Sequence, residues 1–269
     1  MREVDRNYFS SISKLVNEKA YNTSLAGDYK PLHFDPLDDV SCSYVKSSIL
    51  SDGFSIIQIM NEDSINQAKV TAILQAIFGK PFKDKNLGKQ AYAKVQAEDN
   101  AKFYINSHLA QPIHTDEGHT AAYPRYVALY CSLQAQSGGE SIVVPFKPLY
   151  TALIKHFGDD IDLLLQQDAV TVKNVYGIEK KPILLILDNN EIGISYSPVL
   201  QKMWCTHQVF ELFDYITRYV HNRDNQLRFK LKSGQALLLD NCKALHGRTL
   251  FAQDEKRLLY RYWYESCIL

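Results

Sequence analysis

The feature that most constrains this chain is a series of short β-rich segments, bounded by turns, that fills much of the sequence after residue 100. Two of them, 126–133 and 141–144, flank the turn at 137–139, and two more, 236–240 and 258–263, come much later. Many short strands separated by turns are typical of a β-sandwich or a jelly-roll barrel. In such a fold early and late strands share one core, so we expect residues 107–144 and 231–264 to lie together.

Helical patterns occupy much of the remaining chain. Within 64–78, apolar residues recur with the i, i+3, i+4, i+7 spacing of one helix face, and Asp63 or Ser64 can cap its start. Further patterns predict helices over 148–157, 161–166 and 209–220 (capped by Thr206) and a hairpin from 183–187 and 192–196. We therefore expect a single domain over residues 1–269, mainly β with helices. Residues 1–50 would form a helical or irregular extension, and about 145–225 an insertion between core strands.

Charge and cysteine content limit the classes of partner. The sequence has 30 basic and 30 acidic residues, and this balance argues against binding to nucleic acid or to an anionic membrane surface. No apolar run is long enough to span a bilayer, and the N-terminus lacks the apolar region of a secretory signal. The five cysteines are scattered without a CxxC pair, as in a reduced protein. We expect a cytoplasmic protein with a small-molecule substrate and leave its oligomeric state open.

Candidate metal ligands occur at two places as a His-x-acid pair. Residues i and i+2 of an extended chain point to the same side, so His114 and Asp116 can reach one metal ion. The pair His33 and Asp35 has the same spacing but no similar surroundings, and we interpret it as a chance match. His246, which follows a predicted strand and turn, is the candidate third ligand, although a structural role is the alternative. Two histidines and one carboxylate leave positions open on a metal, which suits non-haem Fe(II) and dioxygen.

Two arginines near the C-terminus favour a bound anion. Arg257 and Arg261 are four residues apart in a predicted strand and therefore share a face with Leu259 and Trp263, which suggests that this face points inward. A buried guanidinium needs an anionic partner. A dicarboxylate held by arginine satisfies that need, and internal ion pairs with Asp or Glu are the alternative.

The ordered motifs resemble a known family. They are His114-Thr115-Asp116, then Gly138-Gly139-Glu140-Ser141, then Asp240-Asn241 and Leu245-His246-Gly247-Arg248, then Arg257. This series, between about residues 53 and 264, resembles the Fe(II)/2-oxoglutarate-dependent oxygenases of the taurine dioxygenase and γ-butyrobetaine hydroxylase-like superfamily. The resemblance implies a double-stranded β-helix (jelly-roll) core and iron held by His114, Asp116 and His246.

The same resemblance implies roles for further residues. Arg257 and the Ser141 hydroxyl would bind the distal carboxylate of 2-oxoglutarate, and Arg261 would contact either the other end of this cosubstrate or an anionic substrate. Tyr104, Asn106 and His119 would complete a polar wall around a small substrate. For His119, an ordinary loop position is the alternative interpretation.

The expected reaction is oxidation of an sp3 carbon in a small acidic or amino-acid-like molecule. Hydroxylation is the favoured outcome and desaturation the other, with O2 as cosubstrate and with decarboxylation of 2-oxoglutarate to succinate and CO2. Two alternatives remain at this point. One is a jelly-roll protein that binds a metal or small acid without turnover, and the other is a cupin-type metal hydrolase or isomerase. The oxygenase needs O2 and releases succinate, whereas neither alternative does.

Overall fold

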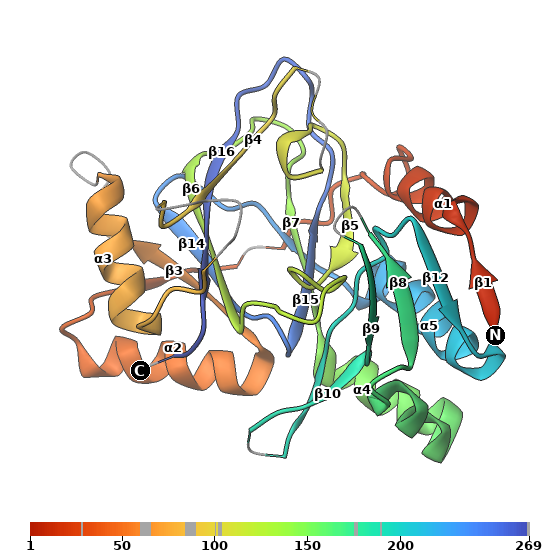
Figure 1. Cartoon of the computed structure of the whole chain (residues 1–269). Helices are drawn as coiled ribbons and strands as arrows, with labels where there is room; N and C mark the ends of the chain where they lie inside the picture. The colour runs from red at the N-terminus through yellow and green to blue at the C-terminus, as the bar shows by residue number, and fades with distance from the viewer. Residues whose placement is uncertain are drawn as a thin grey trace.

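The computed structural model describes residues 1–27, 29–59, 66–83, 90–99, 101, 104–174, 177–188 and 190–267. Two β-sheets lie at its centre (Figure 1). The larger has the order β2-β3-β14-β6-β16-β4, formed by Leu32–Phe34, Phe54–Ile59, Gln235–Asp240, Tyr126–Leu133, Leu258–Tyr264 and Ala93–Gln96. The smaller has the order β13-β7-β15-β5, formed by Leu227–Phe229, Ser141–Pro145, Ala244–Arg248 and Gln111–His114.

Strands from distant parts of the chain are neighbours in both sheets. β14 pairs antiparallel with both β3 and β6, and β16 pairs antiparallel with β6 and β4. In the smaller sheet β15 lies between β7 and β5. This arrangement confirms the expectation that residues 107–144 and 231–264 meet in one core.

Side-chain alternation along each strand divides the molecule into layers. On β16, Leu259 and Trp263 pack into an apolar cluster between the two sheets, whereas Tyr262 and Tyr264 face the helices on the outside. Those helices are α2 (Asp39–Asp52) and α3 (Gln67–Phe78), which cover the outer face of the larger sheet (Figure 1). The inward direction predicted for this face of residues 257–263 is therefore confirmed.

The outer face of the smaller sheet packs against α1 (Arg6–Val16), α4 (Phe146–Phe157) and α5 (His207–His221). A third sheet, with the order β1-β12-β8-β9, joins this layer, and it is formed by Arg2–Val4, Lys202–Cys205, Val170–Lys173 and Ile178–Lys181. The remaining elements are η1 (Tyr104–Asn106), η2 (Gly158–Leu165), the β10–β11 hairpin (Leu184–Ile186, Ile192–Ile194) and η3 (Arg223–Asn225). The elements from α4 to η3 lie between β7 and β13 in the sequence, but in the folded protein these two strands pair directly.

Local signals in the sequence located several of these elements. Thr206 caps α5 by accepting a hydrogen bond from the Val209 N–H, as predicted, and β10 and β11 form the predicted antiparallel pair. Helix α3 begins at Gln67 with Asn66 as its cap, and the predicted caps Asp63 and Ser64 lie outside the described residues. None of the helices in the described part of the chain has the length and hydropathy needed to cross a membrane.

Candidate active site

Three potential metal ligands converge between the two sheets. His114 ends β5, Asp116 follows two residues later, and His246 lies in the middle of β15, directly opposite His114 in the ladder. All three are buried, and one donor atom from each lies within 4.8 Å of the others. Asp116 Oδ1 is 3.3 Å from His114 Nε2 and 3.7 Å from His246 Nε2.

Hydrogen bonding and burial leave both imidazoles suited to metal binding. His114 Nδ1 lies 2.9 Å from the Pro112 carbonyl oxygen, and in the tautomer that donates to this oxygen the Nε2 lone pair points toward Asp116. Burial, together with the nearby His114 and Arg261, lowers the pKa of His246 to about 3, although Asp116 acts in the other direction. His246 is therefore neutral at pH 7. Two histidine side chains and a carboxylate on one side of a cavity fit Fe(II).

Asp116 is fixed through both its backbone and its side chain. Its N–H donates to Asn241 Oδ1 at 2.8 Å, and Asn241 Nδ2 donates back to its carbonyl oxygen at 2.9 Å. Trp263 Nε1 donates to Oδ2 at 2.6 Å, and Arg261 Nη1 lies 3.4 Å from Oδ1. Burial alone would raise the pKa of this carboxyl, but Arg261 and the two histidines hold it well below its usual range. The carboxylate is therefore ionised and ready to bind a cation.

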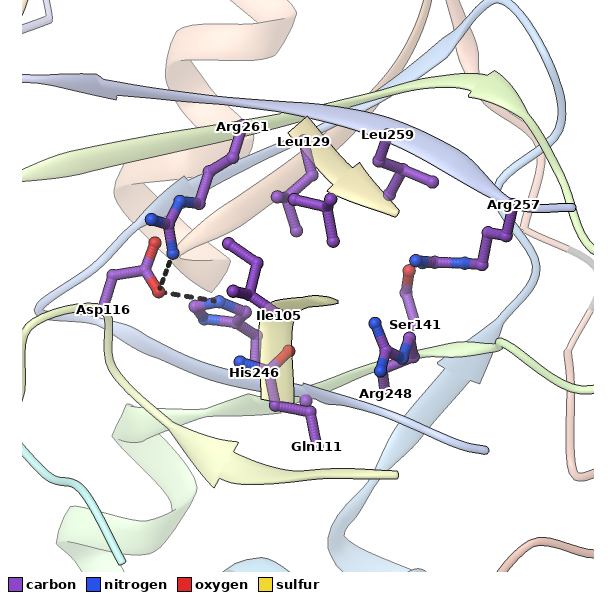
Figure 2. A pocket seen from close by; sticks show the side chains of 12 residues that line it. Ile105, Gln111, Asp116, Leu129, Ser141, His246, Arg248, Arg257, Leu259 and Arg261 are labelled. Atoms are coloured by element: carbon purple, nitrogen blue, oxygen red, sulfur yellow. Dashed lines mark hydrogen bonds and ion pairs between the residues drawn. The ribbon is translucent and has the colours of Figure 1, made fainter. Parts of the chain in front are cut away.

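The far end of the same pocket carries positive charge. Figure 2 shows Arg257, Ser141 and Arg248 grouped at the end opposite Asp116 and His246. Arg257 is only 5% exposed, and no ion pair among the described residues includes it. Burial lowers its pKa to about 10, so it is still charged at pH 7. A buried cation of this kind stabilises a bound anion.

Glycine at position 139 makes room for this arginine. Gly139 has a φ of +64°, and a Cβ there would lie 3.1 Å from Arg257 Cδ. Arg248 is held differently, because its Nη2 donates to the carbonyl oxygens of Ser107 and Leu109 at 2.7 Å each.

Between the two ends, Ile105, Leu129 and Leu259 give the pocket apolar walls (Figure 2). The site can therefore hold a molecule with two anionic ends, one at a metal and one at Arg257.

Several residues predicted from the sequence lie elsewhere. Tyr104 and Asn106 are not among the residues that line this pocket, and residues 104–106 form the 3-10 turn η1. The Tyr104 hydroxyl donates to Ser13 Oγ at 2.6 Å and Asn106 Nδ2 donates to Glu98 Oε1 at 2.7 Å, while Ile105 faces the pocket.

His119 and the two arginines have distinct positions. His119 is half-buried in the loop after Asp116 and is not among the residues that line the pocket. Arg261 does line it, but it pairs with Asp116, so the alternative of an internal ion pair holds for Arg261 and not for Arg257. His33 is exposed on β2, at the edge of the larger sheet, and belongs to no metal-binding group among the described residues.

Two contributors to the site were missed in the sequence. Trp263 served in the sequence analysis only as an apolar residue that indicates the inward face. Because Trp263 follows Arg261 by two residues in the strand, its indole N–H lies on the same face and reaches Asp116. Gln111 lies in the pocket with Nε2 3.1 Å from His114 Nε2, because the register between β15 and β5 shifts between His246 and Arg248. Regular alternation would have put residues 111 and 114 on opposite faces, so no sequence signal identified Gln111.

The fold and the group of two histidines and one carboxylate fit the class of non-haem iron enzymes. The sequence pattern of the taurine catabolism dioxygenase TauD, TfdA family matches residues 33–263. The chain belongs to this family and is an Fe(II)- and 2-oxoglutarate-dependent dioxygenase. No curated protein sequence matches it.

Solved structures share the fold at low sequence identity. An asparagine oxygenase in complex with Fe(II), 3-hydroxyasparagine and succinate has a TM-score of 0.69 and 15% identity, covering 97% of this chain and 92% of its own. The non-haem iron oxygenase OrfP with Fe and α-ketoglutaric acid has a TM-score of 0.65 and 14% identity, covering 98% and 92%. PvcB from Pseudomonas aeruginosa has a TM-score of 0.61 and 15% identity, covering 92% and 89%. At these identities the likeness describes the fold alone.

Proposed function

We propose that this dioxygenase hydroxylates an sp3 carbon of a small, amino-acid-like acid, with His114, Asp116 and His246 as iron ligands. The strands β5, β6, β7 and β13–β16 then correspond to the double-stranded β-helix (jelly-roll) core of the family. Support for this assignment comes from the antiparallel pairing of these strands and from their division between the two sheets that enclose the pocket. Residues 1–50 are proposed as an extension of one domain, and residues from about 145 to 225 as an insertion in it.

The observation that carries this proposal is the position of Arg257, which has no ion-pair partner among the described residues, across the pocket from the three potential metal ligands. 2-Oxoglutarate has one carboxylate next to its keto group and another at its far end. Arg257 and the Ser141 hydroxyl bind the far carboxylate, and the keto-acid end lies at the metal. A charge-assisted hydrogen bond of this type is about twice as strong as a neutral one, so Arg257 fixes the orientation of the cosubstrate.

Iron and 2-oxoglutarate, when bound, supply the oxidation: O2 and 2-oxoglutarate react with R–H to give R–OH, succinate and CO2. The protein residues bind, orient and exclude water. His114, Asp116 and His246 would hold the metal and would leave positions for the cosubstrates. Ile105, Leu129 and Leu259 keep the space between the two charged ends apolar, which limits side reactions with water.

We propose Arg261 as the contact for an acidic group on the substrate, and His119 as a further contact from the loop after Asp116. Arg261 lies within reach of the metal centre and presents its guanidinium to the pocket. An amino acid suits this position because its carboxylate can bind Arg261 while another carbon lies near the metal. The related structures give general support, since they hold hydroxyasparagine in one case and L-Arg in another.

Succinate release measured against a panel of amino acids and other small acids tests the proposal. We expect release that requires Fe(II), 2-oxoglutarate and O2 together and that rises strongly with at least one amino-acid-like compound, whose product gains one oxygen atom by mass spectrometry. Affinity without succinate would favour a binding protein. Turnover without O2 would favour a metal hydrolase or isomerase.

A further inference from the structure

The Asp116 carboxylate has two oxygens in different environments. Oδ1 faces the Nε2 atoms of both His114 and His246. Oδ2 accepts the indole N–H of Trp263 at 2.6 Å, inside the protein, where Trp263 is 7% exposed. This bond is as short as charge-assisted hydrogen bonds become, and it occupies a lone pair that would otherwise be free to bind a metal.

The indole itself is held firmly. The Arg261 guanidinium lies 4.1 Å from its ring centroid, and the Phe82 ring meets it in a T-shaped contact with centroids 6.1 Å apart. The Trp263 indole does not titrate, so its N–H is available as a donor at any pH. Arg261 differs, because its 3.4 Å contact with Oδ1 is long and its charge is attracted to any other anion in the pocket.

We propose that Trp263 is a positioning residue that makes Asp116 a one-oxygen iron ligand. This inference rests on the proposed function, because it takes Asp116 as a ligand. With Oδ2 held by the indole, only Oδ1 is presented to the metal. Arg261 can then move from Asp116 to a substrate carboxylate without leaving the ligand free to rotate.

The number of open metal positions is the functional consequence. A metal held by three protein donors would keep three further positions, which the keto-acid end of 2-oxoglutarate and O2 would need. If Oδ2 also bound the metal, one of those positions would be lost. Trp263 thus preserves the space that the cosubstrates require.

The test uses Co(II), whose visible absorption reports coordination number and geometry. Trp263→Phe removes the N–H and keeps an aromatic ring. Trp263→His keeps a ring N–H at the corresponding place in a five-membered ring but packs less well. Trp204→Phe is the matched control, since Trp204 Nε1 donates to the Glu3 carboxylate at 2.9 Å on β12, a strand of the third sheet.

We expect Trp263→Phe to bind Co(II) about 10- to 100-fold more weakly, as is typical when a hydrogen-bond partner of a metal ligand is removed, and to show an altered absorption spectrum. Trp263→His should recover most of the affinity, and Trp204→Phe should match the wild type in both readouts. A purely structural role predicts the reverse order, with the better-packed Trp263→Phe closer to wild type.

Two outcomes overturn the inference, and only the first of them leaves the proposed function standing. Wild-type affinity and spectrum in Trp263→Phe, with Co(II) bound normally by the wild type, would refute the role of Trp263 and leave the iron site intact. Failure of the wild-type protein to bind Co(II) would refute both.

Discussion

At the scale of single residues, context separates the two His-x-acid pairs. His114 is buried opposite His246, whereas His33 is exposed at a sheet edge. We expect His114→Ala to abolish metal-dependent turnover and lower iron content, because one of three ligands is lost. His33→Ala should keep both at wild-type levels. Iron per protein, measured after reconstitution, checks this, and equal losses in the two variants would contradict the assignment.

Arg257 offers a second residue-level prediction. Arg257→Met removes the guanidinium while keeping an unbranched side chain, so the affinity for 2-oxoglutarate should fall by about 1.5–3 kcal/mol, roughly ten- to hundredfold. The apparent KM for the substrate should change far less. Calorimetric titration of 2-oxoglutarate into the metal-loaded variant measures the effect. Arg125→Met, which removes an arginine paired with Asp240 at 2.8 Å, serves as the control. Unchanged affinity in Arg257→Met would assign the anion to another residue.

At the scale of elements, strand β9 holds the loop that follows Asp116. Lys181 is buried, and its ammonium group donates to the carbonyl oxygens of Gly118 and Ser195 at 2.9 Å each. Burial lowers the pKa of Lys181 to about 7 from an ordinary value of 10.5, although Glu179 acts in the other direction. Between these two pH values the unfolded chain binds a proton that the folded chain lacks. The free energy of unfolding contributed by this group therefore rises with pH across that window and falls as pH drops toward 7.

Replacing Lys181 should remove that pH dependence. In Lys181→Met the slope of unfolding free energy against pH, between pH 8 and 9.5, should be smaller than in wild type by up to about 1.4 kcal/mol per pH unit. Lys180→Met, which removes an exposed lysine of the same strand, should keep the wild-type slope. Urea unfolding at several pH values provides the measurement. Parallel slopes in wild type and Lys181→Met would show that this lysine stays charged when buried.

The elements also show where sequence-based prediction succeeds. Alternation located the inward face of Leu259, Arg261 and Trp263, because β16 is regular from 259 onward. Arg257 also lines the pocket, although the register shifts between Leu258 and Leu259. Alternation missed Gln111, where a register shift moves a residue to the other face, and no periodic pattern indicated the 3-10 turn at residues 104–106. The third sheet was not predicted, since its strands have only three or four residues and show little alternation. The spacing of apolar residues predicts which face a side chain occupies only where the backbone keeps a regular strand or helix conformation.

At the scale of the whole molecule, the site joins the two central sheets. Its ligands come from the smaller sheet and the loop after it, whereas Trp263, Arg261 and Arg257 belong to β16 or directly precede it. Ligands that bridge the sheets should therefore stabilise the entire fold. A metal and 2-oxoglutarate at 100 times their dissociation constants should each add about 2.7 kcal/mol to the free energy of unfolding. Thermal unfolding with Ni(II), with and without 2-oxoglutarate, checks this.

The Arg257→Met variant divides the two contributions. Its melting temperature should rise with Ni(II) as in wild type, but the further rise on adding 2-oxoglutarate should be largely absent. Loss of the Ni(II) effect as well would show that Arg257 supports the fold or the metal centre and not the cosubstrate alone.

The strand order also bears on how the protein matures during its synthesis. β14, β15 and β16 are all interior strands, placed between β3 and β6, between β7 and β5, and between β6 and β4. A nascent chain that ends before residue 235 therefore has open gaps in both sheets and lacks His246, Trp263 and the three arginines of the pocket. Neither the ribosome-bound chain nor a shortened one can hold iron as the finished protein does. We therefore expect metal loading to follow the synthesis of β16. A chain that terminates earlier should expose unpaired strand edges and aggregate, and it should not persist as an enzyme of reduced activity.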